Sequence, residues 1–191
     1  FNNLNIGIVA MKRIMLMSLS IICFLITPNS FAKSKSTWLK LRKAEVGFSL
    51  PAKWNHYQDM LGLPLVFVSP RLKEQRITVS VTPTGINDIP MDPKTLKKEQ
   101  NGWFSGRRKF VSTFKGAITG TFPYSLEKWK YLPEVHAIGY KYKVADKHFV
   151  SHSFYFYCKD QLFHMKSLYE QNVYSKGIDI VESIGNTLRC R

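Results

Sequence analysis

Residues 135–169, VHAIGYKYKVADKHFVSHSFYFYCKDQLFHMKSLY, decide the fold of this chain. Within Val135–Val144, Ile138, Tyr140, Tyr142 and Val144 fall on one face and Lys141 and Lys143 on the other, which is the two-residue period of a strand with one buried face. Short polar turns follow at 145–147 and 159–160, and turns of this length join antiparallel neighbours. The stretch therefore predicts a three-stranded antiparallel meander with strands at Val135–Val144, His148–Cys158 and Gln161–Tyr169.

The sequence on both sides of the meander predicts more strands and two helices. Asp92-Pro93 is a helix-start signal, because Asp accepts hydrogen bonds from free amides and Pro has no amide to lose. We therefore expect a helix over Lys94–Phe114. A second helix is predicted by apolar residues at helical spacing, which are Ile178, Val181, Ile184 and Leu188. Earlier strands are predicted at Val46–Leu50, Pro64–Ser69 and Arg76–Thr82. This order predicts an α+β fold, an antiparallel β-sheet flanked by helices on both faces in a three-layer α/β/α sandwich.

The composition is that of a small globular domain. A chain of 191 residues favours one domain, and aromatic residues make up 14%, far more than a disordered chain holds. No uncharged apolar run is long enough for a conventional span, so we expect no transmembrane segment in the mature chain. The formal net charge is +15, which attracts anionic partners.

The amino-terminal residues have the layout of a secretory signal. Lys12 and Arg13 precede a short apolar stretch, and small residues precede a cleavage site between Ala32 and Lys33. A retained membrane anchor is the alternative. The pattern predicts an exported protein, periplasmic or secreted, divided into an upstream extension (1–10), a signal peptide (11–32), a flexible basic leader (33–44) and a single α+β domain (45–191).

Two cysteines, Cys158 and Cys190, remain after removal of the signal peptide. An even number in an oxidising compartment predicts a disulfide bond. Neither cysteine lies in a CxxC motif or beside a histidine, so neither redox nor zinc chemistry is indicated. Two buried thiols are the alternative.

The sequence contains no motif that identifies an enzyme. It lacks GxSxG, HExxH and the phosphate-binding glycine patterns. His148 and His152 would lie about 13 Å apart along a strand, too far to share one metal ion. His136 and His164 would form a cluster if their strands were neighbours, although surface histidines are the commoner outcome. We predict no catalytic residue, no metal and no cofactor.

Basic residues give the strongest indication of a binding surface. One group lies on the first predicted helix and the other on the meander, and together they comprise Arg107, Arg108, Lys109, Lys141, Lys143 and Lys147. Outside the cytoplasm their anionic partners would be lipid headgroups, envelope glycans or an acidic protein, and nucleic acid is not expected. The alternative is a charge that only keeps the protein soluble.

A second candidate surface precedes the meander. Tyr124, Trp129 and Tyr131, flanked by Lys128 and Lys130, predict an exposed protein-binding loop. The alternative is a strand that is packed by its aromatic side chains.

The order of elements resembles that of the Mog1/PsbP-like family. The resemblance rests on VGFSLPAKW at 46–54, LVFVSP at 65–70, the strand at 77–82 and the closing meander and helix, and it covers most of residues 45–189. It implies an antiparallel sheet between helical layers. It also implies an exported bacterial protein with a non-enzymatic binding, chaperone or assembly role, and it transfers no catalytic residue.

These features predict an exported, non-catalytic binding or assembly protein that acts in the cell envelope through a basic surface. Its partner would be a protein or an anionic envelope component. The alternative is a secreted inhibitor or immunity-type protein that neutralises one envelope enzyme or toxin, which requires one tight partner at a defined edge. A hydrolase with an unrecognised site is a third hypothesis, for which no nucleophile–base pair can be named.

Overall fold

The computed structural model describes residues 36–41, 44–84 and 94–191. The predicted upstream extension, the signal peptide and the cleavage site between Ala32 and Lys33 lie outside the described residues. The helix-start signal Asp92-Pro93 lies outside them as well.

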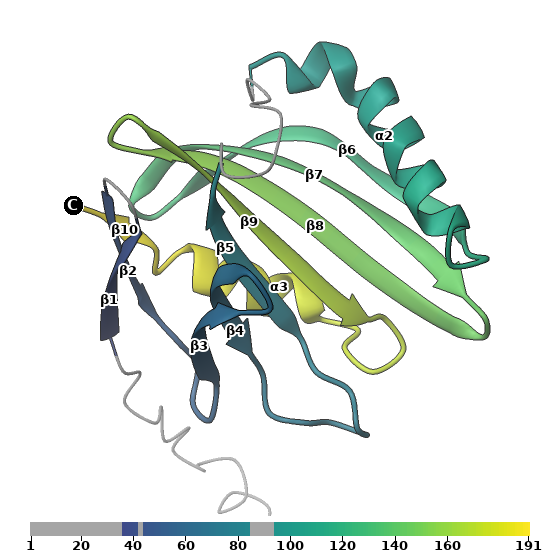
Figure 1. The fold of residues 1–191 in the computed structure, drawn as a ribbon, viewed down its shortest axis with the longest axis horizontal. Helices are drawn as coiled ribbons and strands as arrows, with labels where there is room; N and C mark the ends of the chain where they lie inside the picture. The colour runs from purple at the N-terminus through teal and green to yellow at the C-terminus, as the bar shows by residue number, and fades with distance from the viewer. Residues whose placement is uncertain (1–35, 42–43, 85–93) are drawn as a thin grey trace, which may run out of the picture. The chain divides into compact units, whose positions relative to one another are not determined.

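Strands form most of the described part of the chain, together with helices α2 (Leu96–Ser112) and α3 (Gly177–Gly185) (Figure 1). Seven strands form an antiparallel sheet in the order β3-β4-β5-β9-β8-β7-β6, and three form a second sheet in the order β1-β2-β10. This arrangement confirms the predicted α+β class. The strands are β1 (Ser36–Leu41), β2 (Ala44–Ser49), β3 (Asn55–Met60), β4 (Leu63–Val68), β5 (Thr78–Pro83), β6 (Ala117–Trp129), β7 (Leu132–Val144), β8 (Lys147–Cys158), β9 (Gln161–Glu170) and β10 (Arg189–Cys190).

The predicted meander is confirmed as β7, β8 and β9, which pair in succession within the larger sheet. Ala145 and Lys159, in the two connecting turns, have φ angles of 50° and 53°. A positive φ at a short turn matches the right-handed twist of the strands that it joins. Strands β1, β3 and β10 were not predicted, and β6 was predicted only as the alternative to an exposed loop around Tyr124 and Trp129. In β6, Gly120 and Pro123 obscure the alternation, and its pairing with β7 shifts register along the strand.

The prediction of a flexible leader over 33–44 is wrong for the residues that the structure describes. Ser36–Leu41 is strand β1 and pairs with β2 along its whole length. Packing of Trp38 explains why this segment forms a strand. Its ring lies so close to Gly47 that a Cβ added at Gly47 would meet ring atoms at 2.7 Å. The guanidinium of Arg191 lies 4.2 Å from the centre of the same ring. These contacts dock the segment in spite of its basic composition.

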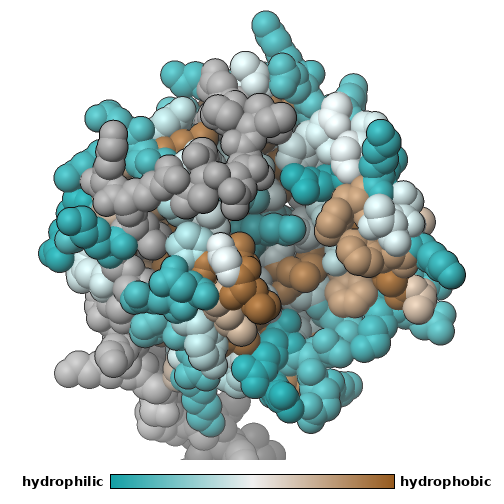
Figure 2. All heavy atoms as spheres, viewed as in Figure 1, coloured by the Kyte–Doolittle hydropathy of each residue, from teal (hydrophilic) through white to brown (hydrophobic). Residues whose placement is uncertain are grey.

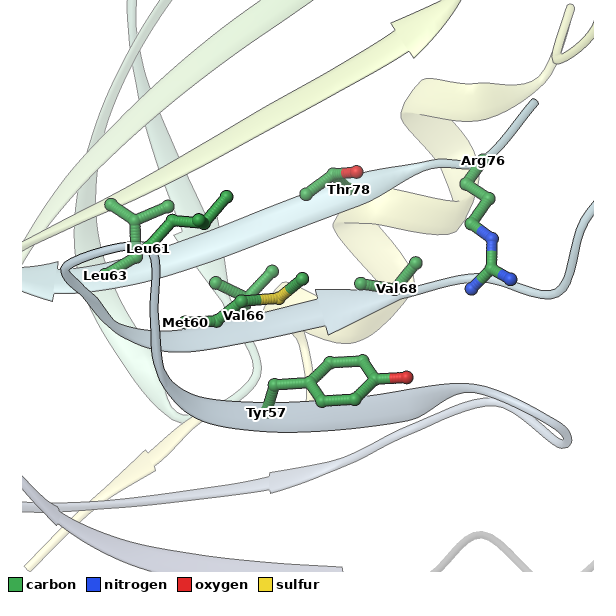
Figure 3. A pocket seen from close by; sticks show the side chains of 8 residues that line it. All are labelled: Tyr57, Met60, Leu61, Leu63, Val66, Val68, Arg76 and Thr78. Atoms are coloured by element: carbon green, nitrogen blue, oxygen red, sulfur yellow. The ribbon is translucent and has the colours of Figure 1, made fainter.

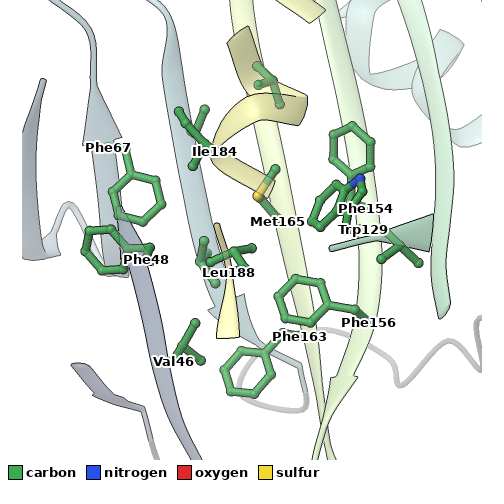
Figure 4. Packing of buried hydrophobic residues seen from close by; sticks show 14 of the residues in the cluster. Val46, Phe48, Phe67, Trp129, Phe154, Phe156, Phe163, Met165, Ile184 and Leu188 are labelled. Atoms are coloured by element: carbon green, nitrogen blue, oxygen red, sulfur yellow. The ribbon is translucent and has the colours of Figure 1, made fainter. Parts of the chain in front are cut away.

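Alternate residues of the central strands belong to two separate clusters of buried side chains. Phe154 and Phe156 of β8 pack with the buried side chains of α3 and with the smaller sheet (Figure 4). Tyr155, which lies between them in sequence, packs with the second cluster. That cluster contains the buried side chains of α2, which are Leu96, Trp103, Phe104 and Val111. Neither of the described helices is long and apolar enough to cross a membrane.

Cys158 and Cys190 form a disulfide bond, as predicted, with their Cα atoms 5.3 Å apart. The bond joins the end of β8 in the larger sheet to β10 in the smaller sheet. Next to it, the backbones of Glu45 and Arg191 exchange two hydrogen bonds of 3.0 Å. The carboxyl-terminal strand is therefore held both covalently and by the ladder of β2.

Candidate functional site

An open apolar groove lies over β3, β4 and β5, at one side of the larger sheet (Figure 3). It encloses about 400 Å³, and ligand pockets commonly measure about 300–1,000 Å³. Val66 and Val68 of β4, both buried, form its floor. Its walls come from β3, from the turn that joins β3 to β4 and from the first residue of β4, and they comprise Tyr57, Met60, Leu61 and Leu63.

The walls of the groove expose apolar side chains to solvent. Leu61 is 93% exposed and Tyr57 is 41% exposed. Figure 2 shows hydrophobic residues gathered over the β3–β4 hairpin. Leu61 also has a φ of 53°, a conformation that costs a residue with a Cβ roughly 1–2 kcal/mol. Exposed apolar side chains gathered around a hollow mark a binding surface.

The groove lies on the same face of the sheet as the cluster under α2. Val66 is paired with Ser80, and Thr82, two residues further along β5, is paired with His164. His164 is in turn paired with Tyr155, a member of that cluster. The side chains of α2 pack on residues of β7, β8 and β9, whereas the groove lies over β3, β4 and β5.

One end of the groove carries a positive charge. The guanidinium of Arg76 and the hydroxyl of Tyr57 lie at the end away from Leu61 and Leu63 (Figure 3). Among the described carboxylates, none forms an ion pair with Arg76. The groove is therefore apolar along its length and cationic at one end.

Sequence reasoning missed this groove, although a signal is present. Met60-Leu61-Gly62-Leu63 is an apolar stretch that contains a glycine and stands between polar β3 residues and a buried strand. Turns at that position are usually polar. Apolar residues at a tight turn can indicate a surface that binds something.

The structure separates the two predicted basic groups. Arg107 lies over the ring of Trp103, at 4.9 Å, and that ring belongs to the cluster under α2. Lys141 points to the other side of the sheet, because its neighbour Tyr140 points into the same cluster. The Lys141 ammonium lies 5.3 Å from the centre of the Phe122 ring. The helical group (Arg107, Arg108, Lys109) and the strand residues Lys141 and Lys143 therefore do not share one face.

Nearby carboxylates offset part of the positive charge of the basic residues on the strands. Lys143 Nζ lies 3.9 Å from Asp146 Oδ1, and Lys147 Nζ lies 3.7 Å from Glu170 Oε2. These residues supply a diffuse positive field and not a single cationic site. The anion-binding role predicted for the six basic residues remains a prediction.

The expected aromatic loop is instead strand β6 and its turn to β7. Trp129 is only 3% exposed and packs 5.1 Å from the ring of Phe154. The Tyr124 hydroxyl lies 3.0 Å from His136 Nδ1. Tyr131 alone stands in the turn, where Arg189 donates a hydrogen bond of 3.0 Å to its hydroxyl. Trp129 at the end of β6 is therefore part of the core, whereas Tyr131 in the turn is 40% exposed.

His136 and His164 do not form the cluster that was considered possible, and His136 is not the surface residue that was expected, because it is buried. His136 of β7 and His164 of β9 both pair with Tyr155 of β8, which lies between them. The ring of His164 stacks on that of Tyr155 at 4.5 Å, and burial lowers the pKa of His164 to about 3. The described residues contain no group of three His, Cys, Asp or Glu side chains that could hold a metal ion.

A second hollow, of about 350 Å³, lies between β6 and α3 and contains titratable groups. Burial, followed by the charge of Lys141, lowers the pKa of His152 to about 4. The His152 ring packs on that of Phe122 at 4.4 Å. Burial, followed by the carboxylates of Glu127 and Asp179, raises the pKa of Glu182. His152 is thus a neutral member of an aromatic stack, and the arrangement offers no activated nucleophile among the residues that line this hollow.

Comparison with known proteins finds similar structures but no related sequence family. No family model matches the sequence, and no curated protein matches it. The crystal structure of LpqN, involved in cell envelope biogenesis of Mycobacterium tuberculosis, covers 83% of this chain and 91% of its own, with a TM-score of 0.54 and 12% identity. The solution structure of cyanobacterial PsbP (CyanoP) from Synechocystis sp. PCC 6803 covers 86% of this chain and 98% of its own, with a TM-score of 0.53 and 9% identity.

The chain has a Mog1/PsbP-like fold. The resemblance read from residues 46–54 and from the closing meander is confirmed at that level. Because the identities are 12% and 9%, the likeness shows the fold alone. In this chain the fold contains the groove over β3, β4 and β5 and the Cys158–Cys190 disulfide bond.

Proposed function

We propose that this protein is an exported, non-catalytic binding or assembly protein of the cell envelope that holds apolar ligands in the groove over β3, β4 and β5. The observation that carries the proposal is the groove itself, with a buried valine floor and exposed apolar walls. Burial of apolar surface stabilises a complex by about 25 cal/mol per Å². The exposed Leu61, Met60 and Leu63 therefore favour an occupant.

Three features support a location outside the cytoplasm. The amino-terminal sequence has the pattern of a signal peptide. The Cys158–Cys190 bond belongs to an oxidising compartment. LpqN, which shares the fold, is involved in cell envelope biogenesis.

The basic residues have a supporting role in this proposal. A net charge of +15 attracts anionic surfaces over several ångströms and accelerates encounter, with a strong dependence on salt. Lys141 and Lys143 lie on the other side of the sheet from the helical group, so the basic residues favour general attraction to an anionic envelope component over recognition of one site.

The proposal includes the three-layer arrangement expected from the sequence, with α2 and α3 on opposite faces of the sheet. It is supported by the division of neighbouring residues, since Tyr155 packs with the cluster of α2 and Phe154 with that of α3. Successive side chains of a strand point to opposite faces.

A neutral apolar fluorophore, N-phenyl-1-naphthylamine, tests the groove. The double variant Leu61→Asn/Leu63→Asn should weaken its binding at least tenfold. The matched control is Leu126→Asn, which changes a leucine that is 61% exposed on β6, away from the groove. Equal binding by all three proteins would place the apolar site elsewhere and overturn the proposal.

A single observation favours the inhibitor hypothesis as a second candidate. Leu61, 93% exposed at the tip of a hairpin, has the position of a residue that inserts into a partner's pocket. Passing an envelope extract over the immobilised protein at low and at high salt distinguishes the inhibitor hypothesis from the proposed ligand-binding function. One saturable protein partner that survives high salt and is lost in Leu61→Asn would favour the inhibitor.

A further inference from the structure

We propose that the ligand of the groove is a single-chain amphiphile whose headgroup carries a carboxylate or phosphate. The acyl chain would lie on Val66 and Val68, and the headgroup would contact Arg76. This inference rests on the proposed function, because it names the chemical class of ligand for the same groove.

The charge of the groove selects an anionic headgroup. Arg76 lies at one end and has no ion-pair partner among the described carboxylates. Its guanidinium offers a planar set of donors that suits a carboxylate or a phosphate. The hydroxyl of Tyr57, at the same end, supplies a second donor. None of the described residues that line the groove is a carboxylate that would oppose an anion.

The backbone around the groove selects an acyl chain over a peptide. The floor strand β4 pairs with β3 on one side and with β5 on the other, so its ladder groups are already bonded. The lining side chains offer few polar atoms beyond those of Tyr57, Arg76 and Thr78. A peptide in the groove would leave buried amide groups without partners, which costs about 1–3 kcal/mol for each group. An acyl chain has no such groups.

The dimensions of the groove suit one chain. From Leu63 to Val68 the floor strand advances about 16 Å, at roughly 3.3 Å per residue. The hollow of about 400 Å³ is near the lower end of the usual range for ligand sites. The exposed hairpin residues Met60 and Leu61 would close over the end of the chain that lies away from Arg76.

Displacement of N-phenyl-1-naphthylamine from the full protein, below the micelle concentration of each competitor, tests the inference. The competitors share a twelve-carbon chain and differ in headgroup: dodecanoate, dodecyl phosphate, dodecyl maltoside and dodecyltrimethylammonium. Inorganic phosphate alone is the fifth. We expect the two anionic amphiphiles to bind at least tenfold more tightly than the neutral and cationic ones, and inorganic phosphate to displace nothing.

Arg76→Gln should remove that preference and leave the affinity for dodecyl maltoside unchanged. The matched control is Arg71→Gln, since Arg71 is a nearby exposed arginine that pairs with Glu74 at 2.9 Å. Tyr57→Phe keeps the wall and removes one donor, so it should weaken anionic binding severalfold. It serves as the test should Arg76→Gln fold poorly.

The outcomes separate this inference from the proposed function. Equal affinity for all headgroups, or an anionic preference that survives Arg76→Gln, would overturn the inference and leave an apolar binding groove in place. Tight binding of inorganic phosphate at Arg76 would overturn it in favour of a site for free anions. Failure of the fluorophore itself to bind would overturn both.

Discussion

The hydroxyl of Tyr174 lies 3.1 Å from Oγ of Ser69, and this contact ties the segment before β5 to the segment between β9 and α3. The same hydroxyl is 3.0 Å from the carbonyl oxygen of Pro70 and 3.2 Å from that of Gln75. Ser69 Oγ in turn accepts a 2.8 Å hydrogen bond from the amide of Ile77. These bonds close the loop that presents Arg76 at the end of the groove.

Tyr174→Phe should therefore weaken the binding of dodecyl phosphate about fivefold, because Arg76 loses its fixed position. A net hydrogen bond stabilises by about 1 kcal/mol, which corresponds to that factor. Binding of the neutral fluorophore should not change. The control is Tyr157→Phe, which alters a tyrosine that is 45% exposed on β8. An equal loss for the neutral fluorophore would show that the hydroxyl only shapes the groove.

Gly185→Ala should destabilise the protein by about 1–3 kcal/mol, as expected for an overpacked core. A Cβ at Gly185 would meet the ring of Trp129 at 2.6 Å, and that ring is buried. Gly102→Ala is the matched change in the other helix, where an added Cβ meets nothing within 4 Å. There the better helix propensity of Ala should stabilise by up to about 1 kcal/mol. Urea unfolding measures the change in the free energy of unfolding for both variants. Changes of the same sign would contradict the packing described for Gly185.

Stability should fall as the pH is lowered from 7 to 5. Burial, and then Lys141, lowers the pKa of His152 from its ordinary 6.5 to about 4. Between these values the unfolded chain binds a proton that the folded chain does not, so acid favours unfolding. The loss from this group is about 2 kcal/mol at pH 5. His164, whose pKa is about 3, acts in the same direction.

Urea midpoints at pH 7 and pH 5, at constant ionic strength, measure this dependence. His152→Phe keeps an aromatic ring beside Phe122 and removes one titrating group, so its pH dependence should be weaker than that of the parent protein. An unchanged dependence would mean that His152 is protonated equally in the folded and unfolded chains.

Removal of the disulfide by Cys158→Ala/Cys190→Ala should destabilise the protein by about 3–4 kcal/mol, the loop-closure value for residues 32 apart in sequence. Unfolding of the parent protein with and without reductant should show the same difference. The double variant should not respond to reductant. Two free thiols in the native protein, detected by thiol titration after unfolding without reductant, would contradict the bond.

Local pattern was enough to predict the strands that have a clear alternation or a continuous apolar run. Val135–Val144 lies within β7 because every second side chain from Ile138 onward is apolar and packs on the core, and the short turns at its end and after Cys158 indicated β8 and β9. The pairing of Cys158 with Cys190 was also predictable, because only two cysteines lie outside the predicted signal peptide. These features depend on local pattern and on counting, which a sequence states directly.

Other features depend on neighbours that are distant in sequence, and they are visible only in the folded chain. The basic segment at Ser36–Leu41 forms β1 because the ring of Trp38 packs on Gly47 of β2, which has no side chain to block it. The choice between a loop and a strand at β6 depended on its pairing with β7, which its own interrupted alternation does not show. Arg76 reached the groove because Tyr174, 98 positions later in the numbering, bonds to the loop that precedes it. The groove arises because the β3–β4 hairpin places apolar residues on a part of the sheet face that lies away from α2. Such long-range packing follows from the summed contacts of the whole fold, and no local stretch of sequence contains it.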